Sequence, residues 1–461
     1  MKVFIRTFGC QMNDVDSERL IALLEGAGYK HETELQQADV VIVNTCSVRQ
    51  QAETRALAYL SSLKSLKKKG KIFGLIGCTA SLHGQAILER YPFIDIVCGP
   101  GRLPEFLLLL KKAIQGQKAV ALGESPCPFL KHSGKKVEIA ASVPVTKGCN
   151  NFCTYCVVPF TRGKLLSRAP QEIIDEVKML AEAGVREVTL LGQNVNEYGQ
   201  DRQFGQTNFV DLLEKVHEVS GVQRLRFLTS HPKDIPEELL KCFLFLPKLY
   251  RHLHLPLQSG SERILEMMNR GYTFNRYLAI VEKVRSLLPE ISISSDILVG
   301  LPPETERDFE QTMKAVKEIR FTDLFIFKYS PRPGTVAATW EDVIPTEVKK
   351  TRHQQLLNLQ KSISESILKE FCGKPQSVFC LRRSSKKSAY LLGRTNLDIP
   401  VIFKGSEALI GQEVRVMITE SSANLLRGYF YPGEDLPREH TEITEKELSC
   451  LPQLSPREEW E

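Results

Sequence analysis

The sequence has no apolar run long enough to cross a bilayer, since its longest, at residues 106–110, stops at Lys111 and Lys112. Arg6 lies where a signal peptide would need its apolar core, so secretion is not expected. The chain also has no tandem repeat, no GxxxxGKS/T phosphate loop and no HExxH zinc motif. These absences exclude membrane-spanning proteins, repeat proteins, P-loop nucleotide hydrolases and HExxH metalloproteases. We therefore expect a cytoplasmic globular protein that has no membrane partner.

The charge is unevenly distributed along a chain of 461 residues, a length that suggests about three domains. The net charge is +6, but residues 434–461 carry −6, so the rest of the chain carries +12. A basic body suggests a polyanionic partner, although lysines on solvated helix faces produce the same excess. The acidic tail has three prolines and few large apolar residues, so we expect it to be disordered.

The first 116 residues alternate short apolar strands with helical stretches. Strands are predicted at 2–7, 38–43, 71–76 and 93–97, and helices at 16–27 and 51–66. This alternation predicts an open parallel α/β sheet with helical crossovers. Residues 117–138 are polar, with Gly, Pro and Lys, and are predicted to be a linker.

The alternation resumes from 139 to 370 on a longer period, and the overall fold class is α/β. Strands are predicted at 141–145, 187–191, 225–228, 253–257, 293–299 and 324–328, with a closing helix at 347–369. Six such units predict a partial (β/α) barrel, whose chemistry would lie at the C-terminal strand ends. Residues 371–433 instead hold five short β segments and predict a small antiparallel β-barrel. Residues 374–433 carry a net +5, for which nucleic-acid binding and plain structural packing are both open.

Three of the twelve cysteines form the sharpest motif, CxxxCxxC at Cys149, Cys153 and Cys156. In a cytosolic chain, cysteines indicate metal or catalytic ligands before disulfides. One loop of this spacing wraps three corners of a cubane iron–sulfur cluster and leaves the fourth iron without a protein ligand. Catalytic metal centres keep such an open position, whereas structural ones close it. A zinc site is the alternative, but no His or Cys follows nearby to complete it.

A second set of cysteines is scattered in sequence: Cys10, Cys46 and Cys78 each follow a predicted N-terminal strand. Parallel strands bring their C-terminal ends to one edge of the sheet, so these thiols should converge as metal ligands would. Cysteine is also common in cores, so simple burial is the alternative. Cys98 follows the fourth predicted strand, and we expect it to be a spectator.

The motifs together resemble the radical S-adenosylmethionine (SAM) methylthiotransferases, and within them the members that act on isopentenylated adenosine in tRNA. The similarity rests on six sequence motifs: GCQMN (9–13), NTCSVR (44–49), CNNFCTYCVVPFTRGKLLSR (149–168), LGQNVN (191–196), LPLQSGS (255–261) and YSPRPGT (329–335). It covers residues 1–433 as an N-terminal methylthiotransferase domain, a radical SAM domain and a TRAM domain. Pro303 departs from the family pattern, which usually has Gly there, so the nearby loop is expected to differ slightly.

This resemblance implies an enzyme that converts C2–H of N6-isopentenyladenosine, expected next to the anticodon, to C2–SCH3. Cys149, Cys153 and Cys156 would hold one 4Fe–4S cluster, on which SAM gives a hydrogen-abstracting radical. Cys10, Cys46 and Cys78 would hold a second 4Fe–4S cluster used in sulfur delivery, with another SAM as methyl donor. All six cysteines would be catalytic. The implied partners are tRNA, an electron donor such as flavodoxin or ferredoxin, and a sulfur source, and the protein is expected to be a monomer.

Further candidates line the predicted strand ends. As SAM contacts we expect Tyr155, Gln193, Asn194, Gln258, Ser259 and Asp296. Loop capping is the alternative for Gln193 and Asn194, and a structural role is the alternative for Asp296. His252 and His254 share a strand face, and hydrogen bonding within the core is favoured over a metal site.

Five cations are candidate tRNA contacts: Arg332, Arg382, Arg383, Lys386 and Lys387. Two other hypotheses stay open. One is the same chemistry on a ribosomal-protein aspartate or another modified adenosine. The other is a non-catalytic iron–sulfur protein that binds RNA.

Overall fold

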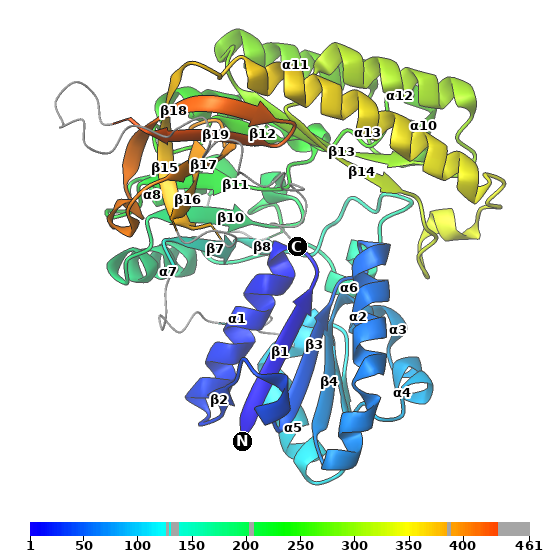
Figure 1. Ribbon diagram of the computed structural model, residues 1–461. Coiled ribbons are helices and arrows are strands. Elements are labelled where there is room, and N and C mark those ends of the chain that lie inside the picture. Colours follow the sequence, from blue (N-terminus) through cyan, green and yellow to red (C-terminus); the bar gives the residue numbers. More distant parts are fainter. Residues whose placement is uncertain (126–128, 131–137, 202–206, 385–388, 432–461) are drawn as a thin grey trace.

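A computed structural model describes residues 1–125, 129–130, 138–201, 207–384 and 389–431, and it folds into three successive α/β and β units (Figure 1). The acidic tail, for which disorder was expected, lies outside the described residues. Among the helices described, none is both long and apolar enough for a bilayer crossing.

The N-terminal unit is a six-stranded parallel sheet with strand order β2-β1-β3-β4-β5-β6. The strands are β1 (Lys2–Phe8), β2 (Lys30–His31), β3 (Val40–Thr45), β4 (Ile72–Gly77), β5 (Ile96–Cys98) and β6 (Ala119–Ala121). Helices α1 (Gln11–Gly26) and α5 (Phe106–Ile114) cover one face. Helices α2 (Gln50–Ser62), α3 (Cys78–His83) and α4 (Ala86–Arg90) cover the other. Because β3 and β4 are buried on both faces, β3 is continuously apolar up to Asn44, and β4 contains only apolar residues and glycine.

Two edge strands of this sheet were not predicted. β6 lies inside the range 117–138 that was predicted as a linker, so the start of that linker is wrong. Its three small residues give no alternating pattern, and only pairing with β5 makes it a strand. β2 consists of two exposed polar residues, so the sequence contains no hydrophobic pattern that would predict a strand there.

The central unit contains six parallel strands in an open, partial barrel. They are β7 (Ala140–Pro144), β10 (Glu187–Leu191), β11 (Arg224–Phe227), β12 (His252–His254), β13 (Ser292–Val299) and β14 (Asp323–Lys328). Its two three-stranded halves meet where Leu225 N donates to Lys248 O and Leu225 O accepts from Tyr250 N, at 2.8 and 2.9 Å. All six strands were predicted to within a few residues.

Helices wrap the outside of this barrel and bury one large apolar core against its strands. They are α7 (Pro170–Glu182), α8 (Phe209–His217), α9 (Glu237–Phe245), α10 (Glu262–Met267), α11 (Phe274–Leu287), α12 (Glu306–Ile319) and α13 (Thr346–Lys369). A short hairpin of β8 (Thr146–Lys147) and β9 (Leu166–Ser167) flanks α6 (Val158–Arg162) after the first strand.

The C-terminal unit is a closed five-stranded barrel of order β15-β16-β17-β19-β18. Its strands are β15 (Pro375–Arg383), β16 (Tyr390–Thr395), β17 (Pro400–Lys404), β18 (Glu413–Ser422) and β19 (Leu425–Phe430). All neighbouring strands run antiparallel except β17 and β19, which are parallel. This barrel packs at the N-terminal ends of β11, β12 and β13, where Arg226 pairs with Asp398 at 2.8 Å and Ser292 Oγ donates to Leu397 O at 2.6 Å.

The N-terminal unit contacts the opposite, C-terminal end of the central barrel through several of its elements. At the start of α1, Met12 and Val15 pack on Leu191, which ends β10. On α2, Glu53 forms an ion pair with Arg332 at 2.6 Å, in the loop after β14. The N-terminal sheet is therefore fixed against the first half and the last strand of the barrel, beside the strand ends where chemistry was expected (Figure 1).

Candidate active site

The three N-terminal cysteines converge at the C-terminal edge of their sheet, as predicted. Cys10 precedes the first residue of α1, Cys46 directly follows β3, and Cys78 opens α3 after β4. The hydrogen bond between the Cys10 and Cys46 thiols and the nearby charge of Arg162 together lower the pKa of Cys10 to about 5, against the effect of burial. The same hydrogen bond raises the pKa of Cys46 well above its usual value, with Cys78 contributing. A thiolate is therefore readily held here.

Two asparagines lock the loops that carry these cysteines. The buried Asn13 donates to Asn44 Oδ1 at 3.0 Å and to Thr45 O at 3.2 Å, and Asn44 Nδ2 donates back to Asn13 O at 2.8 Å. Gly77 has φ +91°, and a Cβ there would lie 2.4 Å from both Asn44 Oδ1 and Thr45 O. These residues lie in or beside the sequence motifs that carry the family resemblance. The hydrogen bonds and close contacts between them were not predicted, because they join positions more than thirty residues apart.

Two buried cations of the central barrel reach the N-terminal cysteines. Arg162, at the end of α6, is 5% exposed, hydrogen-bonds Cys78, and pairs with Asp16 at 3.0 Å. Burial lowers the pKa of Lys147 to about 8, and its Nζ donates to Pro100 O at 3.0 Å. Together they place positive charge where three thiolates would gather. Neither residue was singled out from the sequence, since the contact joins positions 146 residues apart.

The CxxxCxxC loop begins after β8 and is held by α10 and the turn that follows it. Thr154 N donates to Met268 O at 3.1 Å and its Oγ1 to Met267 O at 2.8 Å. Burial, together with the nearby thiols of Cys153 and Cys149, raises the pKa of Cys156 to about 12. The three thiols of this loop therefore form one electrostatic group.

Each cysteine set has one buried arginine beside a thiol. Arg270, 4% exposed, donates from Nη1 to Cys153 Sγ at 3.4 Å, in the same relation as Arg162 to Cys78. Arg270 also donates to Pro256 O at 2.9 Å, which ties the cysteine loop to the end of β12. Hydrogen bonds to ligand sulfurs are one of the features that tune an iron–sulfur cluster.

The donor chemistry of both sets fits iron–sulfur clusters. Within the described ranges, no three Cys, His, Asp or Glu side chains stand as a single metal ion would need them. In a cubane each thiolate binds a different iron, so its ligands stand further apart than ligands around one ion. Three cysteines per set, no histidine among them and an adjacent buried arginine are the composition expected for a cluster with one open iron.

Buried polar atoms that have no partner within the described ranges gather at the C-terminal ends of β10 and β11. They are Gln193 Oε1, Asn194 Oδ1, Asn196 Oδ1, Glu197 Oε2, Ser230 Oγ and His231 Nε2. Asn194 makes no capping bond to the short helix that follows it, so loop capping does not explain it. Because buried polar groups are nearly always paired, this concentration indicates the place of a polar ligand, which suits SAM.

His231 supplies a donor to this group. Burial, together with Arg270 and Lys233, lowers the pKa of His231 to about 2, so its imidazole is neutral. Its Nδ1 accepts from Lys233 N at 3.3 Å, so the proton resides on Nε2, which has no hydrogen-bond partner among the residues that the structure describes. His231 was not predicted as a site residue, because nothing local in the sequence distinguishes it from a core histidine.

The other predicted SAM contacts lie around the same strand ends. Tyr155 packs beside Ile264 and Met268, and its hydroxyl accepts from Arg270 at 3.4 Å. Gln258 has φ +77° and joins β13 through its backbone, by bonds to Asp296 O and from Leu298 N. Asp296 lies on β13 and faces His254, 3.6 Å from Nε2.

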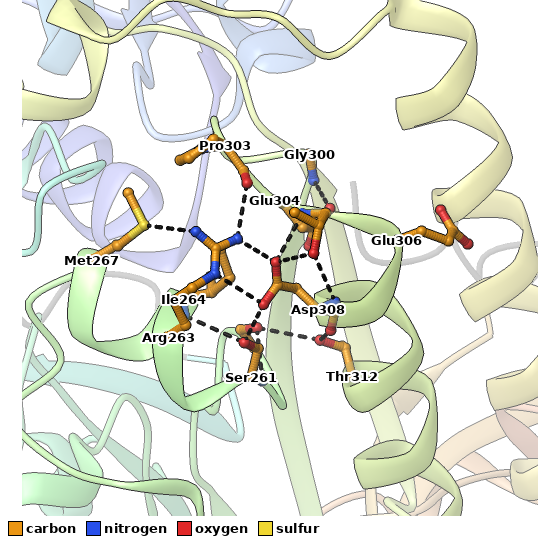
Figure 2. A network of polar contacts seen from close by, with 12 residues as sticks. Ser261, Arg263, Ile264, Met267, Gly300, Pro303, Glu304, Glu306, Asp308 and Thr312 are labelled. Carbon is orange, nitrogen blue, oxygen red and sulfur yellow. Dashed lines mark hydrogen bonds and ion pairs between the residues drawn. The ribbon is translucent and has the colours of Figure 1, made fainter.

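Ser259 is instead part of a closed polar network that precedes α10. Its hydroxyl lies 3.2 Å from Thr312 Oγ1 and accepts from Ser261 N, so it has no free group for a ligand. Asp308 accepts from Ser261 Oγ at 2.6 Å and pairs with Arg263 (Figure 2). The expectation of a direct SAM contact through the Ser259 hydroxyl is therefore not supported.

The loop that contains Pro303 is closed by the same network. Arg263 Nη2 donates to Pro303 O at 2.9 Å, and Gly300 N donates to Glu304 Oε2 at 2.8 Å (Figure 2). Glu304 also pairs with the buried Arg352 of α13 at 2.8 Å. Proline at 303 leaves these bonds in place, since they use its carbonyl and not the N–H that proline lacks.

The predicted tRNA contacts divide into three cases. Arg332 is 8% exposed and paired with Glu53, so it joins two domains and is not presented to a phosphate; that expectation is not supported. Arg382 and Arg383 are exposed on β15, where Arg383 pairs with Glu407 of the same barrel. Lys386 and Lys387 lie outside the described residues.

The two histidines of β12 are hydrogen-bonded in the core, the interpretation favoured from the sequence. His252 Nε2 and His254 Nδ1 both contact Ser294 Oγ at 2.8 Å. Cys98, the expected spectator, is fully buried and donates only to Gly99 O among the residues described.

The partial barrel, its cysteine loop and the unpaired polar atoms at its strand ends define a radical SAM protein. The model of the radical SAM superfamily matches residues 143–316, that of the uncharacterized protein family UPF0004 matches 2–99, and that of the TRAM domain matches 373–430. The radical SAM methyltransferase TsrM from Kitasatospora setae has a TM-score of 0.53 at 14% identity, and the match covers 73% of this chain and 74% of that chain. That likeness concerns the fold.

Curated relatives narrow the class to one family. The tRNA-2-methylthio-N(6)-dimethylallyladenosine synthase of Dictyoglomus thermophilum is 42% identical over 94% of this chain and the whole of that protein. The enzyme of the same name from Thermoanaerobacter sp. is 45% identical over 92% of this chain and 91% of that protein. This chain belongs to the tRNA-2-methylthio-N(6)-dimethylallyladenosine synthase family.

Proposed function

We propose that this chain is a tRNA-modifying methylthiotransferase, which replaces C2–H of N6-isopentenyladenosine with C2–SCH3. The observation that carries the proposal is the approach of two cysteine sets across a domain boundary. Arg162 follows Cys156 by six residues and hydrogen-bonds Cys78 of the other set. A reaction that removes hydrogen from a base and adds sulfur to the same carbon needs both functions beside one substrate.

The cysteine sets divide the chemistry between them. Cys149, Cys153 and Cys156 would hold the cluster that binds SAM, with Gln193, Asn194, Tyr155 and Gln258 around it. Cys10, Cys46 and Cys78 would hold the cluster from which sulfur is delivered. When bound, these groups supply an electron, a hydrogen-abstracting radical, sulfur and a methyl group.

The protein's own residues neutralise the charge of the thiolates and orient the bound ligand. Arg162 and Arg270 offset thiolate charge in sites with little water, where an unpaired charge is costly. Neutral His231 offers a donor, and Gln193, Asn194 and Asn196 offer acceptors, so a ligand with both kinds of group is held in one orientation. Hydrogen abstraction from carbon requires no acid–base pair, and none is needed among these residues.

The partners follow from the same chemistry. The C-terminal barrel would bind tRNA through exposed cations such as Arg382. An electron donor such as flavodoxin or ferredoxin and a separate sulfur source would complete the turnover, in the cytoplasm and on a monomer.

The test uses two triple variants of the full chain, measured for iron, for SAM cleavage and for tRNA nucleosides. Wild-type protein should hold about eight irons, four for each cubane. Changing Cys149, Cys153 and Cys156 to Ala should leave about four irons and abolish formation of 5′-deoxyadenosine. Changing Cys10, Cys46 and Cys78 to Ala should also leave about four, yet 5′-deoxyadenosine should still form while methylthiolation stops.

Cys98→Ser is the matched control, since this buried thiol also ends a strand of the same sheet but lies outside both sets. It should keep full iron content and full activity. Full iron in the second triple variant would refute the two-cluster assignment. Absence of SAM cleavage by wild-type protein would indicate an RNA-binding protein, and modification of a ribosomal protein in place of tRNA would indicate the other substrate.

A further inference from the structure

The concave face of the central barrel carries a polar and aromatic group that the proposed reaction has not used. Leu253, Ile293, Ile297, Leu324 and Ile326 point into the apolar core. Because side chains alternate along a strand, the residues between them face the inside of the barrel. On three adjacent strands these include His254, Asp296 and Phe325, and register pairs His254 with Ser294 and Asp296 with Phe325.

These three side chains line a partly open space. Phe325 is 41% exposed, which is high for a large aromatic ring inside a barrel, and its ring lies edge-on to His254 with centroids 6.0 Å apart. The Asp296 side chain is 25% exposed and that of His254 is 12%. A flat group that enters here would meet an aromatic ring and two hydrogen-bonding side chains.

A chain of hydrogen bonds connects His254 to the C-terminal barrel. Asp398, in the turn between β16 and β17, accepts from Arg226 and Arg394 and lies 3.2 Å from His252 Nδ1. His252 Nε2 and His254 Nδ1 each lie 2.8 Å from Ser294 Oγ. The two arginines and His252 hold the pKa of Asp398 well below its usual range, so it is a carboxylate that can only accept.

This chain fixes the tautomer of both histidines when their imidazoles are neutral. His252 must donate from Nδ1 to Asp398, so its Nε2 accepts the one hydroxyl proton of Ser294. The oxygen of Ser294 then accepts from His254 Nδ1, and Nε2 of His254 is left as an acceptor. It faces Asp296 Oδ2, another acceptor, at 3.6 Å, which is longer than a hydrogen bond.

Two acceptors side by side call for a donor between them. The base in the proposed function, N6-isopentenyladenine, has a single N–H, at N6, while its N1, N3 and N7 can only accept. We propose that His254 Nε2 and Asp296 together accept the N6–H of the substrate base, and that Asp398 is a positioning residue that sets the His254 tautomer from the C-terminal barrel. This inference rests on the proposed function and assigns the residues that determine specificity for the substrate base.

The test compares two anticodon stem-loop RNAs on cluster-loaded full-length protein. One carries N6-isopentenyladenosine, and the other carries N6-methyl-N6-isopentenyladenosine, which has no N–H. We expect wild-type protein to bind the first about tenfold more tightly, the size of one charge-assisted hydrogen bond. His254→Leu should bring the affinity ratio of the two RNAs close to one.

Ser294→Ala tests the connection separately, because it removes no group that would touch the base. Without the hydroxyl, His254 is free to carry its proton on Nε2, and the affinity ratio should fall several-fold while both RNAs still bind. Ser292→Ala is the matched control: it lies on the same face two residues away and bonds Leu397 O, but it is outside the histidine chain. It should keep the wild-type ratio. Iron content and RNA-independent SAM cleavage establish that each variant is folded.

The outcomes separate the two proposals. An unchanged ratio in His254→Leu, or an equal fall in Ser294→Ala and Ser292→Ala, overturns this inference while leaving methylthiolation of the first RNA intact. A preference due only to the bulk of the extra methyl group would survive in Ser294→Ala, and that also overturns it. Failure of wild-type protein to methylthiolate the first RNA removes the proposed function, and this inference with it.

Discussion

Arg162 of the central barrel and Asp16 of the N-terminal sheet form an ion pair across the domain boundary, with Nη2 and Oδ2 3.0 Å apart. The same guanidinium hydrogen-bonds Cys78, and its side chain is almost fully buried. Since Arg162 lies one short helix beyond the CxxxCxxC loop, it holds the two cysteine sets at a fixed relative position. A domain that moved freely could not keep this charge buried and paired.

Replacing Arg162 by Gln should therefore separate the two half-reactions. The thiolates of the second set lose a charge-assisted bond worth about 1.5–3 kcal/mol, which corresponds to a loss of about ten- to a hundredfold in methylthiolated tRNA. SAM cleavage, measured as 5′-deoxyadenosine without RNA, should stay within about twofold of wild type. Arg102→Gln is the control, because Arg102 is a partly exposed cation paired with Glu105 in the same sheet unit. Equal product yields from the two variants would contradict this role.

A second prediction concerns Gly77 and uses Gly28 as its control. Both have positive φ, +91° and +88°, but a Cβ at Gly77 would lie 2.4 Å from two atoms of the Cys46 loop, whereas Gly28 has open space. Gly28→Ala should lower the free energy of unfolding by about 1 kcal/mol, the cost of the left-handed conformation alone. Gly77→Ala should cost about 3 kcal/mol or more and reduce bound iron toward about four atoms. Thermal unfolding and iron analysis of both variants provide the measurement, and similar losses in the two would refute the crowding argument.

The parts of this site that the sequence predicts are those that depend on local pattern. The convergence of Cys10, Cys46 and Cys78 follows because strand ends of a parallel sheet share an edge, and the CxxxCxxC loop carries its own spacing. Strands such as β3, which begins Val-Val-Ile-Val, were predicted because buried parallel strands are continuous apolar runs. β6 escaped prediction because Ala-Val-Ala has no period of its own.

The parts that the sequence does not predict are tertiary pairs. Arg162, Arg270 and His231 acquire their roles from partners far away in the chain, and no spacing rule connects them. Arg332 shows the converse error: its Pro-rich loop at a strand end suggested a phosphate contact, yet Glu53 of another domain neutralises it. A cation in a loop is informative about ligands only once its carboxylate neighbours are known.

The pH dependence of stability should reveal the neutral, buried His231. Its pKa is lowered from 6.5 to about 2, so between these values the unfolded chain binds more protons than the folded one. Stability contributed by this group is therefore full above pH 6.5 and falls as the pH drops, by about 2 kcal/mol between pH 7 and pH 5. In His231→Asn, urea unfolding at these two pH values should show a correspondingly smaller difference. A difference equal to that of wild type would show that His231 is protonated in the fold.

The C-terminal barrel should bind tRNA phosphates through exposed arginines, and here the structure predicts two changes of opposite sign. Arg382 is exposed on β15, and neighbouring Arg383 is held by Glu407. Each phosphate neutralised contributes a log–log salt slope of roughly −0.7 to −0.9. Arg382→Ala combined with Arg383→Ala should therefore weaken all substrate tRNAs about equally and make the slope shallower by roughly 0.7 to 0.9, the contribution of Arg382 alone, because Arg383 is already paired with Glu407. Glu407→Gln should instead tighten binding and steepen the slope, because it frees Arg383 and removes a negative charge.

The control for a general change in net charge is Lys241→Ala, which removes an exposed, ion-paired lysine of α9. Filter binding of one tRNA at four salt concentrations measures all these slopes, with iron content and RNA-independent SAM cleavage expected to be unchanged. If the double variant and Lys241→Ala give the same slope, these arginines do not contact the tRNA, and another surface must bind it.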